Sequence, residues 1–215
     1  MRLALRSIAV PSRQIRVAST VATTLAIAAG LLVSAPAEGA SRFDYVFPVV
    51  GRASYGHTHS LYPASDILAN CGLPVVSPVD GVVLELNRID YWSRGVRNGS
   101  TRGGKFVSIR GDDGVRYYGS HLSVVKRGLR AGDRIDAGQK IGEVGRTGRA
   151  GACHLHFGIS PVCAGKGDWW IRRGVIWPWP YLDSWRKADV SKHLSPRREV
   201  RAWKEENGCP PPPDS

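Results

Sequence analysis

Short apolar runs separated by Gly, Pro and Asp dominate the chain between Phe47 and Ile159, and no dozen residues there follow a helical period. Runs rich in β-branched residues with turn residues at both ends are typical of strands. Such runs predict strands at 73–76, 82–89, 105–110 and 115–119. The last two flank Gly111-Asp112-Asp113-Gly114, a pattern that predicts a β-hairpin.

The rest of this region predicts a compact, antiparallel all-β domain. Five glycines punctuate residues 132–148, and recurrent glycines are typical of tight corners in small β-domains. Residues 90–104 have little apolar surface to bury, so we expect an exposed loop there, interpreted as the rim of a cleft. The glycine-rich stretch contains neither Gly-x-Gly-x-x-Gly nor Gly-Lys-Ser/Thr, which argues against a phosphate-binding loop.

The first forty residues have the pattern of a secretory signal peptide. Four arginines precede an uncharged run at 17–37, and small residues suitable for cleavage follow at 35–37 and 38–40. An uncleaved membrane anchor is the alternative, because the run is almost long enough to span a bilayer. Several threonines and Pro36 dilute its hydrophobicity, so we expect cleavage, and a secreted, extracytoplasmic protein without a membrane span.

The chain is strongly basic. Its formal net charge of +12 falls by three, to +9, when the four arginines and one glutamate of residues 1–40 are removed. For an exported protein this charge favours an anionic polymer surface such as a cell wall. No nucleic-acid-binding motif accompanies the charge, so we expect no nucleic-acid partner.

The four cysteines (Cys71, Cys153, Cys163 and Cys209) predict disulfides in an exported chain. Four cysteines allow three pairings, and the sequence does not choose among them. A cysteine-based zinc site is a weaker alternative, because no Cys-x-x-Cys pair is present. A bridge at Cys153 would stiffen the segment that follows it.

That segment contains a His-x-His pair, His154 and His156, among apolar residues. In a strand the two imidazoles point to one face, with β-carbons about 6–7 Å apart, while Leu155 and Phe157 face a core. Two polar residues on a wet face are the plain alternative. Five of the six histidines, however, fall between residues 57 and 156, and histidine is the commonest metal ligand. The distribution therefore predicts a zinc site.

Two further segments supply candidate groups. The first, 57–67, contains His57, His59 and Asp66, and the second, 117–123, contains His121. A catalytic zinc site has three protein ligands and one position for water. From the residue types alone, the roles stay open: both histidines of the pair could ligate together with His59 or His121, or one could ligate while the other handles protons.

The order of these segments resembles the lysostaphin-type (LytM-like) zinc peptidoglycan endopeptidases. The similar pieces cover roughly residues 47–160: an early His followed by Asp-Ile, then 72–83, 113–123, 131–142 and His-Leu-His-Phe-Gly at 154–158. The resemblance implies an all-β fold of the duplicated hybrid motif type, a compact antiparallel sheet or sandwich at residues 41–165. It also implies an exported Zn²⁺ metalloendopeptidase that hydrolyses peptide bonds in peptidoglycan stem peptides or cross-bridges.

The resemblance further implies the roles of individual residues. Carried over, His59, Asp66 and His156 are the metal ligands, whereas His121 and His154 orient the attacking water and stabilise charge at the scissile carbonyl. One departure concerns the first ligand: six residues separate His59 from Asp66, where the family usually has three. This makes His57 a competitor for the first ligand position, although a shorter loop connects His59 to Asp66.

Residues 166–215 form a C-terminal extension that contains six of the seven tryptophans and ends in a Pro-rich tail. One interpretation is a basic aromatic wall that stacks on sugars; the favoured one is an aromatic flap closing one edge of the sheet. Residues 189–207 predict a short helix. We expect a monomer with peptidoglycan and anionic wall polymers as partners. A non-catalytic wall-binding or hydrolase-activating protein is the alternative function.

Overall fold

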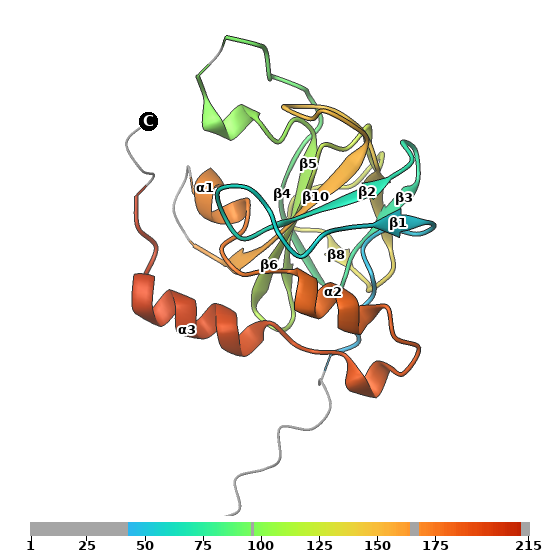
Figure 1. The fold of residues 1–215 in the computed structure, drawn as a ribbon, viewed down its shortest axis with the longest axis vertical. Coiled ribbons are helices and arrows are strands. Elements are labelled where there is room, and N and C mark those ends of the chain that lie inside the picture. Colours follow the sequence, from blue (N-terminus) through green and yellow to red (C-terminus); the bar gives the residue numbers. More distant parts are fainter. Residues whose placement is uncertain (1–42, 96, 164–167, 212–215) are drawn as a thin grey trace, which may run out of the picture. The chain divides into compact units, whose positions relative to one another are not determined.

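A large antiparallel sheet contains β10 (His154–Pro161), the strand that holds the His-x-His pair (Figure 1). The computed structural model describes residues 43–95, 97–163 and 168–211, so the expected signal peptide at 1–40 lies outside the described residues. Seven described strands form this sheet, in the order β1 (Ala53–Ser54), β2 (Ser65–Ala69), β10 (His154–Pro161), β6 (Val115–Ser120), β5 (Phe106–Gly111), β4 (Gly81–Asn87) and β8 (Arg134–Ile135).

A smaller sheet contains β3 (Pro74–Val76), β9 (Lys140–Glu143) and β7 (Val124–Val125). The four predicted strands correspond to β3, β4, β5 and β6, and β5 and β6 form the predicted hairpin. Its turn closes when the Gly114 N–H donates to the Gly111 carbonyl, with Gly114 at a φ of 80° that favours glycine. The predicted antiparallel all-β fold class is therefore confirmed.

The side chains of strand β10 alternate between the two faces of the large sheet. Leu155, Phe157 and Ile159 are at most 2% exposed and belong to the hydrophobic core. Apolar residues from both sheets join them in one buried cluster, including Ile67, Val75, Val107 and Ile141. His154 and His156 alternate with the core residues and therefore point to the opposite face, as the sequence pattern predicts.

The C-terminal segment is mainly helical. It forms α1 (Trp169–Arg172), α2 (Trp179–Trp185), the 3₁₀ turn η2 (Val190–Lys192) and α3 (Arg197–Asn207); a further 3₁₀ turn, η1 (Gly99–Thr101), interrupts the exposed loop at 90–104. The helix predicted at 189–207 is thus divided into η2 and α3, because Pro196 lies immediately before the second helix, where its fixed φ suits a helix start.

Helix α2 holds the aromatic residues that the sequence places in a flap. The Trp185 ring stacks on Tyr45 with centroids 5.0 Å apart and contacts Tyr117 and Phe157 of the large sheet. Both of those residues point toward the core. The segment therefore covers the core face of the sheet rather than only an edge, since the apolar side chains of a helix lie on one side and need an apolar face to cover.

Two disulfides resolve the pairing that the sequence leaves open. Cys71 pairs with Cys153, and Cys163 pairs with Cys209. The first bridge fixes the chain just before His154 to the turn after β2, and the second links the region beyond β10 to the end of α3. No helix among the described residues is long and apolar enough to cross a membrane.

Truncating a core side chain of α2 should destabilise the whole fold. Leu182 is fully buried, so Leu182→Ala is expected to lower the free energy of unfolding by about 2–5 kcal/mol through lost burial and a cavity. Leu194→Ala is the matched control, because that side chain is 51% exposed, and it should cost less than about 1 kcal/mol. Denaturant unfolding monitored by circular dichroism measures both; equal effects would contradict this packing.

Candidate metal centre

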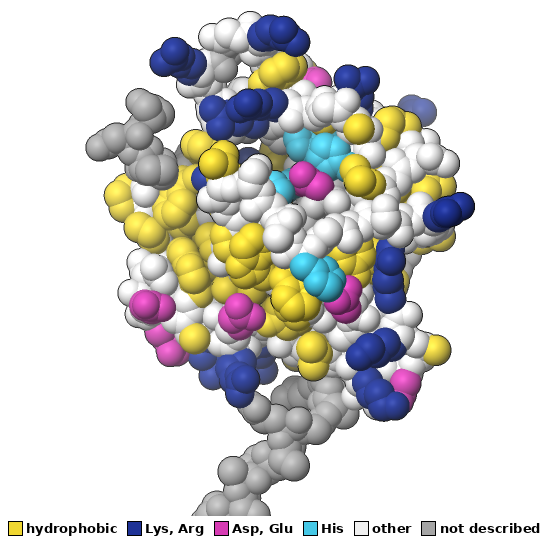
Figure 2. All heavy atoms as spheres, in the orientation of Figure 1, with side chains coloured by type: hydrophobic (Ala, Val, Ile, Leu, Met, Phe, Trp, Pro, Cys, Tyr) yellow, Lys and Arg dark blue, Asp and Glu magenta, His cyan; other side chains and the backbone are white. Residues whose placement is uncertain are grey.

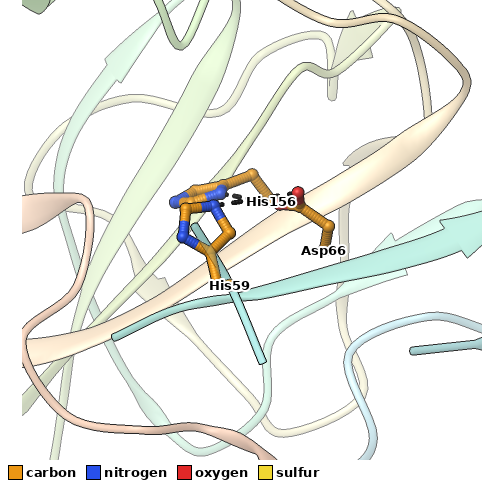
Figure 3. A group of neighbouring side chains, drawn as sticks. All are labelled: His59, Asp66 and His156. Atoms are coloured by element: carbon orange, nitrogen blue, oxygen red, sulfur yellow. Dashed lines mark hydrogen bonds and ion pairs between the residues drawn. The ribbon is translucent and has the colours of Figure 1, made fainter. Parts of the chain in front are cut away.

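Three side chains of the kinds that bind metals converge at the meeting point of β2 and β10. One ligand atom from each of His59, Asp66 and His156 lies within 4.8 Å of the other two (Figure 3). The His59 Nε2 atom is 3.7 Å from Asp66 Oδ2, and the His156 Nδ1 atom is 2.9 Å from Asp66 Oδ1. Asp66 and His156 are cross-strand partners, so the sheet register itself brings them together.

Backbone carbonyls orient both imidazoles of this group. His59 Nδ1 lies 3.0 Å from the Tyr62 carbonyl oxygen, and His156 Nε2 lies 2.9 Å from that of Arg173. A carbonyl oxygen only accepts, so each of these ring nitrogens is the N–H donor. The other nitrogen of each ring then faces Asp66. This is the arrangement by which protein metal sites orient their histidines.

His156 provides a direct test of whether a cation fits. Its two ring nitrogens face two acceptors, the Arg173 carbonyl and the Asp66 carboxylate, but a neutral imidazole has only one N–H. A positive charge is therefore required between Nδ1 and the carboxylate, supplied either by a second proton or by a metal ion. Two imidazole nitrogens and a carboxylate oxygen are a donor set that suits Zn²⁺.

The carboxyl group of Asp66 is strongly acidic in this setting. Burial opposes its ionisation, but the hydrogen bond from His156 and the nearby imidazoles of His156, His154 and His59 outweigh burial and lower its pKa to about 2. Burial and the neighbouring His156 lower the pKa of His59, against the smaller opposing effect of Asp66. Near pH 7 the group thus presents an anionic oxygen and a neutral imidazole of His59.

His121 and His154 form a second pair beside this group. Their ring centroids lie 4.6 Å apart, and the His154 Nε2 atom is 3.7 Å from Asp66 Oδ1. The Nδ1 atom of His121 is 2.7 Å from the Thr147 carbonyl, and that of His154 is 2.9 Å from the Ala152 carbonyl. Each Nδ1–H therefore donates to the backbone, and each Nε2 is left as an acceptor.

His121 occupies a special backbone position. It directly follows β6 with a φ of 65°, in the left-handed region that few non-glycine residues adopt and that is often found at functional sites. Its backbone N–H donates to the Gly103 carbonyl. Burial and the adjacent His156 and His154 lower the pKa of the His121 imidazole to about 4, which keeps the ring neutral at pH 7.

The other two histidines lie elsewhere. His57 is exposed, pairs with Asp183 at 3.1 Å and stacks on Trp179 with ring centroids 4.3 Å apart. His193 is buried in the C-terminal segment, with Nε2 3.0 Å from the Lys187 carbonyl. Of the two competing early histidines, the structure thus places His59 beside Asp66 and gives His57 a different partner.

The five sequence-predicted histidine and aspartate residues share a cleft of about 340 Å³. Figure 2 shows histidine and acidic side chains side by side at a hollow on one face. Sequence reasoning missed three residues of the cleft that shape the centre, namely Tyr62, Trp169 and Arg173. The anchoring roles of Tyr62 and Arg173 belong to their carbonyl groups, which every residue possesses, so no side-chain motif could have revealed them.

Two glycines allow this close packing. A β-carbon on Gly158 would lie 2.4 Å from the Arg173 carbonyl oxygen, the group that accepts from His156. A β-carbon on Gly174 would lie 2.4 Å from the Pro63 carbonyl oxygen, next to the loop that carries Tyr62. The glycine two residues after His156 is therefore needed for the C-terminal segment to reach the metal-binding group.

Comparison with known families places this fold and its group of five residues in a known class of protein. Residues 60–166 match Peptidase family M23, and the chain belongs to this family. The match begins directly after His59 and includes Asp66, His121, His154 and His156.

Three curated relatives illustrate the similarity. The chain is 28% identical over 167 residues to an L-Ala–D-Glu endopeptidase of Bacillus subtilis, covering 69% of this chain and 46% of the relative. It is 38% identical over 93 residues to glycyl-glycine endopeptidase ALE-1 of Staphylococcus capitis, and 36% identical over 93 residues to lysostaphin of Staphylococcus simulans. Each of these two matches covers 43% of this chain, and 22% and 16% of the relative, respectively. The chain thus spans less than half the length of these relatives.

Solved structures give a similar picture. The catalytic domain of lysostaphin from Staphylococcus simulans is 27% identical, with a TM-score of 0.47, and the match covers 61% of this chain and 93% of that domain. The structure of the antimicrobial peptidase lysostaphin from the same organism is also 27% identical, with a TM-score of 0.49, covering 67% of this chain and 55% of that one.

The placement of the two early histidines predicts their effect on metal content. His59→Ala should lower bound zinc well below one ion per chain after dialysis, because it removes one of the three candidate ligands. His57→Ala is the matched control and should retain the wild-type content, since its imidazole pairs with Asp183. Elemental analysis of the dialysed proteins measures the ratio. Loss of zinc from the His57 variant with retention in the His59 variant would reverse the assignment.

The close approach at Gly158 predicts a second effect on the metal. Gly158→Ala should displace the Arg173 carbonyl and release His156, which lowers zinc affinity by about 10–100-fold. Gly56→Ala is the control, because the nearest atom to its added β-carbon is 3.9 Å away. Competition with a chromophoric chelator measures affinity in both variants. Unchanged affinity in the Gly158 variant would show that the carbonyl contact is dispensable.

Proposed function

We propose that the chain is an exported zinc metalloendopeptidase that hydrolyses peptide bonds in peptidoglycan. The observation that carries the proposal is the convergence of His59, Asp66 and His156, in which one ring nitrogen of each imidazole faces the carboxylate and the other contacts a backbone carbonyl. We assign these three residues as the Zn²⁺ ligands, and His121 and His154 as the catalytic residues beside them. Membership of a peptidase family supports hydrolysis over simple metal storage.

The bound ion supplies a Lewis acid and brings the pKa of water toward neutrality. The protein supplies the proton transfers. His154 and His121 present their Nε2 atoms to the cleft, and one of these atoms accepts the proton of the attacking water. The resulting imidazolium then returns the proton to the leaving amine. In this proposal the histidines perform the task that a glutamate performs in His-Glu-x-x-His peptidases.

The backbone anchors have a mechanistic consequence. Because Nδ1 of both His121 and His154 donates to a carbonyl, the proton that enters or leaves each ring does so at Nε2, which faces the cleft. The rings do not have to reorient between accepting and returning the proton. Preorganisation of this kind lowers the barrier, because the groups already occupy their reactive positions.

Peptidoglycan is the proposed substrate because one curated relative of this chain is named as a peptidoglycan DD-endopeptidase, and another as an L-Ala–D-Glu endopeptidase. Two disulfides that use all four cysteines and a strongly basic composition support export to an oxidising, anionic environment. We assign residues 1–40 to a signal peptide, 41–165 to the peptidase domain and 166–215 to the C-terminal extension. Arg173, from the extension, completes the orientation of His156.

The proposal predicts metal-dependent release of new amino groups from purified peptidoglycan. Release should stop when a chelator removes the metal and resume when zinc is added back. His156→Ala should reduce release to background, because it removes a ligand that also pairs with Asp66. Labelling of free amines over time measures the reaction.

The control is His193→Ala, which changes a histidine away from the cleft and should retain activity when the protein is folded. Mapping the new amino termini by mass spectrometry then identifies the cleaved bond. A folded, zinc-loaded protein that releases nothing from several wall types, yet still adheres to them, would instead indicate the non-catalytic wall-binding function.

A further inference from the structure

Three arginines of the candidate metal cleft have no acidic partner. Arg102, Arg149 and Arg173 all line the cleft, and none forms an ion pair within the part of the chain that the structure describes. Arg172 also lines the cleft but pairs with Glu85 at 2.7 Å, and the buried Arg116 pairs with Asp168 at 2.6 Å. The paired arginines are thus neutralised, whereas the three unpaired ones are available to an anion.

Arg173 is held in a defined position. Its guanidinium carbon lies 3.9 Å from the ring centroid of Tyr62 and 5.2 Å from that of Trp169. Contact with aromatic faces fixes the plane of a guanidinium and leaves its N–H edge free for a planar partner. The Nε atom of Arg173 is buried without a hydrogen-bond partner, as are those of Arg116 and Arg172, so a ligand in the cleft would be met by the terminal N–H groups of Arg173.

Arg102 lines the same cleft as Arg173. An anion bound beside the Arg173 guanidinium would therefore also meet the positive charge of Arg102.

The same residue is coupled to the proposed metal centre. The Arg173 carbonyl accepts the hydrogen bond from Nε2 of His156, a proposed metal ligand. The backbone from which the Arg173 side chain extends is therefore fixed beside the proposed metal centre. A group bound by this guanidinium therefore lies within one side-chain length of the reacting bond. That distance suits a neighbouring residue of the same peptide substrate.

We propose that Arg173, assisted by Arg102, binds a free carboxylate of the peptide substrate beside the bond to be cleaved. This inference rests on the proposed function and specifies its substrate class: acidic stem peptides in preference to neutral, glycine-type bridges. A carboxylate matches the planar fork of a guanidinium with two parallel hydrogen bonds. Arg173 is a specificity-determining residue in this proposal, and its side chain takes no part in proton transfer.

Paired substrates test the proposal. A stem peptide with a free carboxylate beside the cleaved bond is compared with the otherwise identical carboxamide. The wild-type protein should hydrolyse the acid with a kcat/KM about 10–100-fold higher, mainly through KM, because a charge-assisted bidentate contact is lost in the amide. Arg173→Gln should remove this preference by slowing hydrolysis of the acid alone. Arg173→Lys, which keeps the charge but not the fork, should retain only part of it.

Arg186→Gln is the matched control. The Arg186 guanidinium also lies over two aromatic rings, Phe47 at 4.1 Å and Tyr55 at 4.8 Å, but it is not among the residues that line the cleft. This variant should keep the wild-type preference. Zinc content is measured in parallel, because the Arg173 substitutions leave the carbonyl in place and should leave the bound metal unchanged.

Direct binding separates this proposal from the proposed function. Calorimetry with the metal-free protein measures affinity for the acid and the amide, so neither hydrolysis nor zinc contributes. Tighter binding of the acid that disappears in Arg173→Gln supports the carboxylate site even if no peptide is cleaved. Equal binding of acid and amide, or a preference that survives in Arg173→Gln, overturns it, even if the protein proves to be an active peptidase.

Discussion

Hydrogen bonds from imidazole N–H groups to backbone carbonyls determine the chemistry of the cleft. His59, His121, His154 and His156 each use one ring nitrogen in this way, with the carbonyls of Tyr62, Thr147, Ala152 and Arg173 as acceptors. Each ring then presents its other nitrogen to the cleft that contains Asp66. The acceptors come from separate segments, so the centre exists only when these segments are all packed together.

The C-terminal segment contributes to both the core and the cleft. On the core face, Trp185 packs against Tyr117 and Phe157, while on the other face Trp169 and Arg173 line the metal-binding cleft. The link between the two faces is the close crossing of Gly158 by the Arg173 backbone. Burial of apolar side chains on one face supplies most of the free energy that holds this segment in place. The polar groups of the other face therefore remain available to ligands.

The loop between His59 and Asp66 shows why an unusual spacing can preserve a site. Its extra length contains Tyr62, whose carbonyl anchors His59 and whose ring contacts both His59 and Arg173. The insertion therefore brings the first histidine back to Asp66 and at the same time builds one wall of the cleft. Spacing alone suggested competition between His57 and His59, but spatial proximity to Asp66 distinguishes them.

Sequence alone determined strands β3, β4, β5, β6 and β10, the hairpin at residues 111–114 and the shared face of His154 and His156, because alternation and turn chemistry are local properties of the chain. It also indicated the five residues that meet in the cleft. Only the tertiary structure decided the disulfide pairing, the packing of α2 across the core face and the roles of Tyr62 and Arg173. These features depend on which distant segments meet, and a backbone carbonyl, being common to every residue, leaves no trace of its partner in the sequence.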